Sequence, residues 1–168
     1  MAFYGYLNVE GVPGESTDSE HKDWINIKGF SHSVSMTIAE KKHYNTPGRP
    51  SLRYDHGQFI VEKLLDSTTP TLSLYCSNGN MIKTVKVNLC RAIEQKSVPY
   101  MQYEMEDVFI TKVAAQGFED GKYGNMPFEE VTFYYAKIFW IYTQIDQETG
   151  TKSKVVETNW NTVKNQQD

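Results

Sequence analysis

The sequence predicts a mainly β protein, a sandwich or barrel of antiparallel strands with one short helix. Several segments alternate apolar and polar residues, which is the pattern of a strand with one buried face. The chain contains 11 tyrosines, 8 phenylalanines and 3 tryptophans, and aromatic residues are enriched in strands. A helical pattern with clear start and stop signals occurs in one segment, at about residues 69–78.

Length and charge restrict the classes of function. At 168 residues the chain is expected to be a single domain, 1–168, that buries a full core without a metal or disulfide. The formal net charge is -4 and the basic residues are scattered, which argues against nucleic-acid binding. We expect no membrane insertion, because no apolar run approaches the roughly 20 residues that a spanning helix needs. The N-terminus lacks the pattern of a cleavable signal peptide, and the two cysteines are expected as free thiols.

The first half of the chain carries three strand patterns. The first covers residues 2–10. The second covers residues 24–36, where the phase of Ile25 and Ile27 changes at Lys28-Gly29 and predicts a β-bulge or bend. Residues 38–57 contain Pro47, Gly48 and Pro50 and are expected as a long extended loop, whose arms could be strand-like. Residues 58–65 return to the strand pattern.

The helix prediction rests on local rules. Thr69 is expected as the N-cap and Pro70 as the first helical residue, where its missing N–H costs nothing. Gly79 is expected to end the helix in the left-handed conformation. Leu72, Tyr75 and Cys76 form an apolar stripe, so the helix should dock on the β-structure, with Cys76 as a packing residue rather than a nucleophile.

The second half predicts four more strands, at residues 82–91, 99–113, 128–145 and 153–160. The pattern at residues 99–113 changes phase near Asp107, which predicts a second bulge. Residues 128–145 are apolar on both faces, which implies cover on both sides. The tail at 162–168 is expected to be frayed.

No group of residues forms a convincing active site, and we expect no enzyme and no cofactor. The loop with Glu15, Asp18 and His21 is either a solvated turn, which is favoured, or a metal-ligand set. His32, His43 and His56 are expected as surface or packing residues. The acidic residues at 104, 106 and 107 form either a glycosidase-like pair or a solvated strand face. Two alternatives to a structural protein therefore stay open, a monomeric ligand-binding barrel and a metal-assisted hydrolase.

Three stretches together resemble the haemolysin-coregulated proteins, the tube-forming proteins of bacterial type VI secretion systems. The first contains Gly14, Glu15, Ser16, Asp18, His21, Ile25, Ile27, Ser31 and Ser35. The second contains Asp66, Ser67, Thr68, Thr69, Pro70, Leu72, Cys76 and Gly79. The third contains Phe128, Glu129, Glu130, Val131, Phe133, Tyr135, Lys137, Ile138, Trp140 and Tyr142. The three motifs occur in the family's order and with similar spacing.

The resemblance implies a small antiparallel β-barrel of two packed sheets with one flanking helix. It also implies a homohexameric ring, rings stacked into a hollow tube, and a contractile sheath, a trimeric spike and effector proteins as partners. Such a tube is assembled in the bacterial cytoplasm and secreted, without a signal peptide, to the extracellular space or a target cell. In the family the long loop joins rings, so the expected ring-stacking residues are Lys41, Lys42, His43, Tyr44, Asn45, Arg49 and Arg53. The small hydroxyls of Ser31, Ser33 and Ser35 are expected to border the lumen.

Overall fold

A computed structural model shows a mainly β chain with one short helix, and it describes residues 3–39 and 51–168. This confirms the predicted fold class. The elements are, in chain order, β1 (Tyr4–Val9), β2 (Ile25–Ile27), β3 (Gly29–Ser31), β4 (Val34–Ala39), β5 (Ser51–His56), β6 (Phe59–Leu64), α1 (Thr69–Asn78), β7 (Ile82–Ile93), β8 (Lys96–Gln116), β9 (Lys122–Asn125), β10 (Phe128–Ile145) and β11 (Lys152–Asn161).

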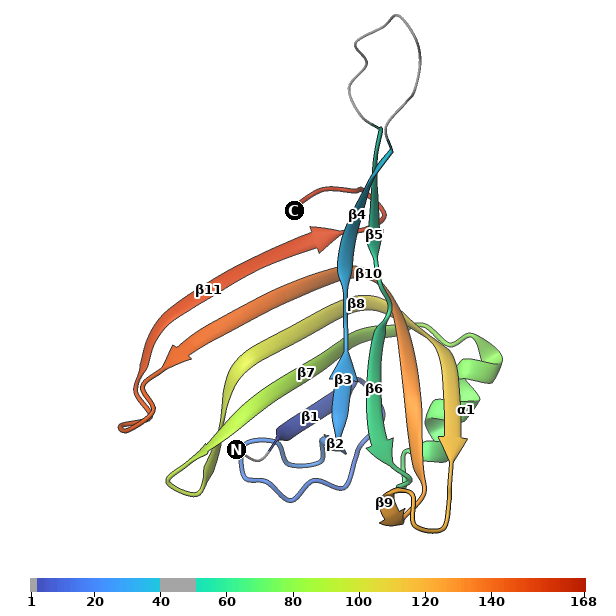
Figure 1. The fold of residues 1–168 in the computed structure, drawn as a ribbon, viewed down its shortest axis with the longest axis vertical. Helices are drawn as coiled ribbons and strands as arrows, with labels where there is room; N and C mark the ends of the chain where they lie inside the picture. Colours follow the sequence, from blue (N-terminus) through green and yellow to red (C-terminus); the bar gives the residue numbers. More distant parts are fainter. Residues whose placement is uncertain (1–2, 40–50) are drawn as a thin grey trace, which may run out of the picture.

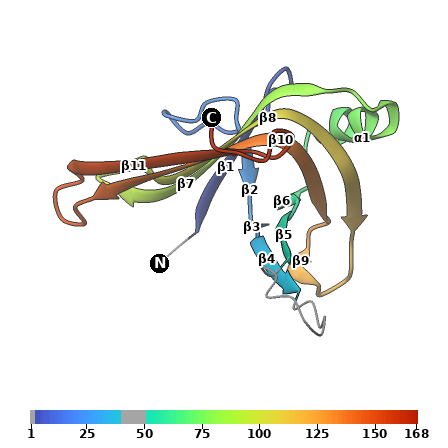
Figure 2. The same ribbon diagram turned by 90° about the horizontal axis from the view of Figure 1, so that it is seen from above.

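The strands form one curled eight-stranded sheet and a separate two-stranded ribbon. The order in the large sheet is β2-β1-β7-β8-β10-β6-β3, with β11 paired to β10, and all of these pairings are antiparallel. The ribbon consists of β4 and β5 and projects from the curled sheet (Figure 1). Seen from above, the far ends of β7, β8, β10 and β11 extend as a flat wing on the side opposite α1 (Figure 2).

The curled sheet closes at Lys28. The strand on one side of this residue, β2, pairs with β1, and the strand on the other side, β3, pairs with β6. Lys28 itself donates its backbone N–H to the carbonyl of Glu62 at 2.7 Å. The predicted irregularity at Lys28-Gly29 is confirmed, and its effect is that one short segment joins both edges of the barrel.

Apolar side chains fill the inside of the barrel. The phase change predicted near Asp107 is also present, because Met105 and Val108 are both fully buried and Asp107 between them has a φ of 51°. The most buried apolar residues come from six of the strands and from the helix: Leu7, Val9, Ile25, Phe59, Val61, Leu72, Val85, Val87, Met105, Val108, Val131, Phe133 and Ile138.

Helix α1 docks through the predicted stripe. Leu72 is fully buried, Tyr75 and Cys76 pack against the core, and Gly79 ends the helix with a φ of 66°. The N-cap prediction was wrong by one residue, since the cap is Thr68. Thr69 Oγ1 instead accepts a hydrogen bond from the backbone N–H of Asp66 and donates one to Glu129, which makes this side chain a tie between helix and sheet.

Two segments differ from expectation. The described part of the expected loop at 38–57 is the end of β4 and the whole of β5, paired in register from Val34 with His56 to Ala39 with Ser51. The expected frayed tail folds back on the sheet: Thr162 donates its backbone N–H to the carbonyl of Ala136, and the Asp168 carboxylate lies 3.2 Å from Lys137 Nζ.

Candidate assembly surfaces

The β4–β5 ribbon exposes an apolar face. Cross-strand pairs place Val34, Met36 and Ile38 of β4 on the same face as Leu52 and Tyr54 of β5. Each of these five side chains is between 45% and 56% exposed. We call this set the ribbon face. Contiguous exposed apolar side chains of this kind mark interaction surfaces in soluble proteins.

The opposite face of the ribbon is polar. Ser35 pairs with Asp55, and Thr37 pairs with Arg53, which is the member of the expected ring-stacking set that the structure describes. The other six members, Lys41, Lys42, His43, Tyr44, Asn45 and Arg49, lie outside the described residues. The expected lumen residues Ser31, Ser33 and Ser35 are all exposed, in β3, β4 and the link between them.

A second exposed apolar area lies on the wing. Tyr142 of β10 and Val156 of β11 are direct cross-strand partners and are 44% and 52% exposed. Met101 of β8 pairs with Tyr142 from the other side and is half-buried. The prediction that residues 128–145 are covered on both faces therefore fails at Tyr142 within one subunit, which leaves this area available for a neighbour.

The polar loop at residues 14–23 is exposed at most positions, as the favoured solvated turn would be, but the buried His21 anchors it to the barrel. His21 is 2% exposed and its ring stacks on Tyr6 with centroids 4.3 Å apart. Asp18 Oδ1 lies 2.9 Å from His21 Nδ1, and Asn88 Nδ2 lies 3.0 Å from His21 Nε2. The hydrogen bond with His21 holds the pKa of Asp18 below its usual value, against the opposing effect of burial.

Cys90 completes a Cys-His-Asp arrangement whose thiol is buried and held in its protonated form. Its sulfur lies 3.8 Å from His21 Nε2, which is the order of contact found in cysteine nucleophiles. However, the side chain is 3% exposed and burial raises the pKa of the thiol to about 12. The thiolate that nucleophilic catalysis requires is therefore suppressed, and the cluster packs the loop onto β1 and β7.

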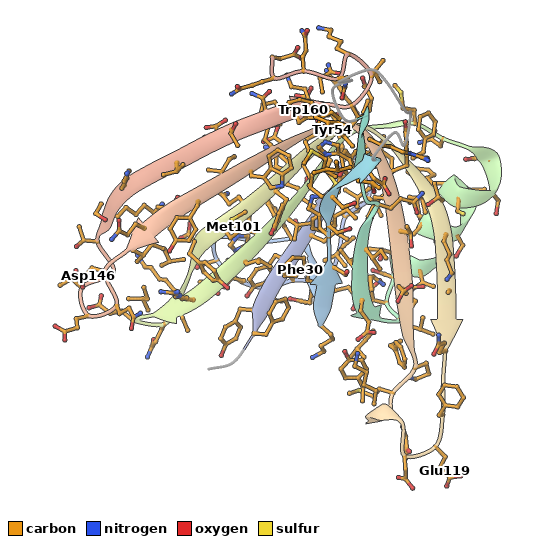
Figure 3. All side chains as sticks on the ribbon, turned by 45° about the horizontal axis from the view of Figure 1, so that its top comes forward. Phe30, Tyr54, Met101, Glu119, Asp146 and Trp160 are labelled. Atoms are coloured by element: carbon orange, nitrogen blue, oxygen red, sulfur yellow. The ribbon has the colours of Figure 1, made fainter. Side chains whose placement is uncertain are left out.

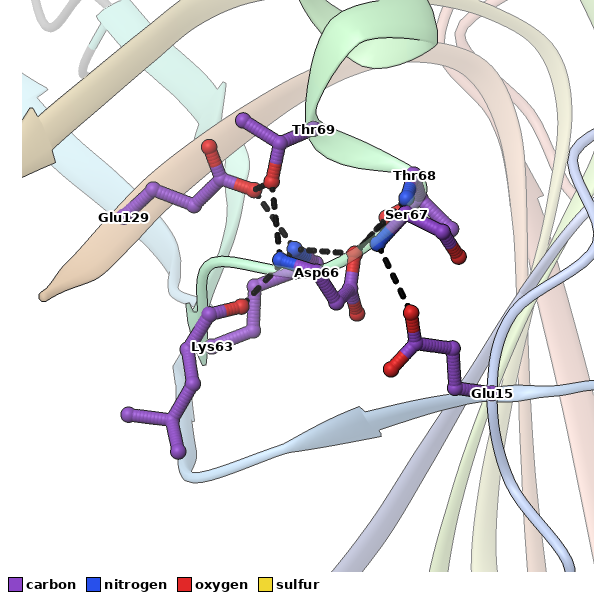
Figure 4. A network of polar contacts seen from close by, with 8 residues as sticks. Glu15, Lys63, Asp66, Ser67, Thr68, Thr69 and Glu129 are labelled. Carbon is purple, nitrogen blue, oxygen red and sulfur yellow. Dashed lines mark hydrogen bonds and ion pairs between the residues drawn. The ribbon is translucent and has the colours of Figure 1, made fainter. Parts of the chain in front are cut away.

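Glu15 lies outside this cluster. It links the first motif, at residues 14–35, to the second, at residues 66–79. Its carboxylate accepts a hydrogen bond from the backbone N–H of Ser67 at 3.0 Å, just before α1 (Figure 4). Gly14 beside it has no room for a side chain, because a Cβ there would lie 2.4 Å from the carbonyl oxygen of Trp24. Within residues 3–39 and 51–168 no group of three or more His, Cys, Asp or Glu side chains could hold a metal ion.

A buried ion pair anchors the start of α1. Lys63 of β6 and Glu129 of β10 are direct cross-strand partners, both fully buried, with 2.5 Å between Lys63 Nζ and Glu129 Oε1. Lys63 Nζ also donates to the Leu64 carbonyl and to Asp66 Oδ1, each at 3.0 Å. Asp66 in turn accepts from the backbone N–H of Thr68, the N-cap (Figure 4). The role of this network is architectural.

Sequence reasoning missed the ribbon face and the burial of His21. The sequence does contain a signal for the ribbon face. Leu52 and Tyr54 alternate with polar residues as Val34, Met36 and Ile38 do, which is the pattern of two strands. His21 gave no signal, because the residues that bury it, Tyr6 and Asn88, are distant in sequence. The other acidic candidates stay apart: Glu104 faces Lys86 at 3.8 Å on the barrel exterior and is 32% exposed.

Together the curled barrel-like sheet, the structural polar clusters and the exposed apolar areas on the ribbon and the wing define a small, mainly β structural protein. The family described as "Type VI secretion system effector, Hcp" matches residues 6–142. The chain therefore belongs to the Hcp family of type VI secretion system proteins.

Individual relatives are distant but match over most of their length. The Pseudomonas aeruginosa protein named "Protein hcp1" is 23% identical over 167 residues, covering 99% of both chains. A second protein of that organism, named "Major exported protein", is 24% identical over 136 residues, covering 79% of this chain and 76% of its own. A solved structure entitled "Structure of a type six secretion system protein" shares the fold, with a TM-score of 0.84 at 23% identity, covering 99% of this chain and 100% of its own.

No helix in the described part of the chain is long and apolar enough to cross a membrane.

Proposed function

We propose that this chain is a structural subunit of the inner tube of a type VI secretion system. It forms homohexameric rings that stack into a hollow tube, and it is exported with the tube. Membership of the Hcp family supports this role, as does the relative named for its export. The contractile sheath, the trimeric spike and effector proteins are the expected partners, and the lumen carries effectors.

The observation that carries the proposal is the pair of dissimilar apolar areas. A ring of identical subunits uses head-to-tail contacts, which require two different patches on each subunit. The ribbon face and the Tyr142–Val156 area belong to different sheets and differ in shape, one lying on a projecting ribbon and the other on a flat wing (Figures 1 and 2). Tyr54 of the ribbon face and Met101, the cross-strand partner of Tyr142, lie well apart (Figure 3). Solvent exposure of both in a free subunit costs hydrophobic free energy that contacts between subunits recover.

Electron microscopy of the purified full chain in negative stain tests the proposal. The expected images show six-fold rings with a central hole. A protein that stays strictly monomeric at high concentration, in sedimentation as well as in images, contradicts it.

Matched variants of the ribbon test its role. Met36→Asp places a charge on the ribbon face and is expected to prevent ring formation, whereas Thr37→Asp adds the same charge to the opposite, polar face beside Arg53 and is expected to leave ring formation intact. If both variants assemble like the unmodified chain, the ribbon face is not a contact.

The finer assignments are tested separately. Deletion of residues 45–50 is expected to weaken stacking while isolated rings remain, as the assignment of Lys41, Lys42, His43, Tyr44, Asn45, Arg49 and Arg53 to ring stacking requires. Loss of the rings themselves argues against that assignment. Ser31→Gln is expected to change effector retention if the row of Ser31, Ser33 and Ser35 borders the lumen; unchanged retention argues against it.

A ligand-binding barrel is the weaker candidate, because the barrel interior holds the fully buried core side chains where an apolar ligand would lie. Native mass spectrometry that finds a co-purified ligand on a monomer would favour it over the tube subunit.

A further inference from the structure

Two histidines stand where the β4–β5 ribbon leaves the barrel. On one side β3 ends at Ser31 and β4 begins at Val34, so His32 lies in the link. On the other side β5 ends with His56, and β6 begins at Phe59. The ribbon is thus joined to the barrel through two short connections, each with a histidine.

The connections are held by few polar contacts. Gly57 donates its backbone N–H to the carbonyl of Ser33 at 2.9 Å, which ties the two connections to each other at the base of the ribbon. The Tyr135 hydroxyl of β10 donates to the carbonyl of Gly57 at 2.9 Å, which ties them to the barrel. The hydrogen bonds of the β4–β5 ladder join these two strands to each other and none of them runs to a strand of the barrel. The ribbon can therefore detach from the barrel as a unit without losing its own ladder of hydrogen bonds.

Aromatic rings surround both imidazoles. His32 stacks on Phe59 with centroids 5.4 Å apart and meets the edges of Tyr103 and Tyr135 at 6.0 and 5.9 Å. His56 stacks on Trp160 at 5.8 Å with an interplanar angle of 12°. Trp140 lies between the two, 6.3 Å from His32 and 6.4 Å from His56, so one aromatic cluster holds both connections.

The imidazole nitrogens in this cluster lack hydrogen-bond partners. His32 Nδ1, His32 Nε2 and His56 Nδ1 are all buried without one in the described part of the chain. A neutral imidazole has one N–H donor, whereas an imidazolium has two. Protonation of His32 therefore places a charge and an unpaired N–H donor inside the aromatic cluster, and protonation of His56 places a charge against the Trp160 ring.

The neighbouring groups offer little compensation. Asp55 adjoins His56 and tends to raise its pKa, but burial dominates and the pKa of His56 is lowered. Burial and the proximity of His56 lower the pKa of His32 and outweigh the neighbouring Gly57 backbone, which tends to raise it. Burial also raises the pKa values of the Tyr103 and Tyr135 hydroxyls, which supply no negative charge near neutral pH. The indole faces of Trp140 and Trp160 attract a cation, which reduces the effect of burial without reversing its direction.

We propose that His32 and His56 form an acid-sensitive hinge, at which protonation releases the β4–β5 ribbon from the barrel. The ribbon is attached while both imidazoles are neutral. This goes beyond the proposed function, since it is a property of the single subunit and requires neither rings nor a tube.

Proton linkage gives the direction and size of the effect of pH on ribbon attachment. In the released state both imidazoles are hydrated and titrate near the ordinary value of about 6.5, whereas in the attached state their pKa values are lower. The released state therefore binds more protons, and attachment, complete above about pH 6.5, weakens as the pH falls below it. Between pH 7.5 and 5.5 each histidine shifts the equilibrium by up to about tenfold, and the pair by up to about 100-fold.

Hydrogen exchange of the full chain at pH 7.5 and 5.5, corrected for the intrinsic pH dependence of exchange, tests the hinge. Release leaves the Gly57–Ser33 hydrogen bond at the open end of an isolated two-stranded ribbon, where it frays. Protection of the Gly57 amide is therefore expected to fall by up to about 100-fold at pH 5.5, while amides of β7 around Val87 keep theirs. The double variant His32→Phe, His56→Phe retains aromatic packing and is expected to lose this pH response. Equal protection of the Gly57 amide at both pH values overturns the proposal, and so does a pH response of this amide that persists in the double variant.

A titration of the unmodified chain by NMR makes the test independent of whether the variant folds. The chain has 4 histidines, so their ring signals can be followed one by one. His32 and His56 are expected to titrate below about 6.5. A pKa at or above that value for both rings overturns the proposal. Failure of ring formation in the microscope leaves this result unaffected, so the two ideas are tested apart.

Discussion

Glu129→Ala removes one partner of the buried ion pair and is expected to destabilise the fold strongly. Loss of one member of a buried pair typically costs about 3–5 kcal/mol, because the other charge stays buried. Lys63 would keep two acceptors, the Leu64 carbonyl and Asp66 Oδ1, each at 3.0 Å. The expected cost is therefore at the lower end, about 3 kcal/mol, which is a large share of the roughly 5–15 kcal/mol that stabilises a domain.

Urea unfolding followed by tryptophan fluorescence measures this cost, and the next residue provides the control. Glu130 points to the other face of β10 and is 38% exposed, with Lys112 Nζ 4.0 Å away. Glu130→Ala is expected to cost less than about 1 kcal/mol, as exposed ion pairs do. Equal costs for the two variants, or a cost below about 1 kcal/mol for Glu129→Ala, would refute the view that the pair anchors α1.

The remaining predictions concern α1 and the cysteines. Leu72→Ala is expected to lower the free energy of unfolding by about 2–5 kcal/mol, because the side chain is fully buried against the barrel; a cost under about 1 kcal/mol in the same urea assay would mean that the helix is not docked. Gly79→Ala is expected to cost about 1 kcal/mol because φ is 66° at that position, and an unchanged midpoint would argue against the left-handed end. Alkylation of the folded protein at pH 8 is expected to label Cys76 before Cys90, whose thiol is buried and has a raised pKa. Mass spectrometry that finds Cys90 labelled as fast as in unfolded protein would contradict this.

The strand pattern and the barrel seam were predictable because their causes are local. A phase change at Lys28-Gly29 is visible in the residues themselves, and so is the left-handed position of Gly79. The N-cap was misplaced because Thr68 and Thr69 both suit the position and the choice depends on Glu129, sixty residues away, which holds the Thr69 hydroxyl.

The candidate surfaces were harder to predict. Pro47, Gly48 and Pro50 made a loop the natural interpretation of residues 38–57, although β5 begins at Ser51 directly after them. The polar residues at 15–23 suggested solvent contact, because nothing local reveals that Tyr6 and Cys90 enclose His21. Whether a polar residue is buried depends on partners that only the fold brings together.

The strand order has a consequence for how the chain folds. β1 begins to pair at Tyr4 with Cys90 of β7, and β10 connects three strands, β6, β8 and β11. Pairings between residues so distant in sequence must overcome loop-closure entropy before they contribute, which makes folding slow. During synthesis the barrel of one subunit cannot close before Phe128 and the residues after it have left the ribosome. Until then the early strands present unpaired edges, and we expect the nascent chain to depend on protection from pairing with its neighbours.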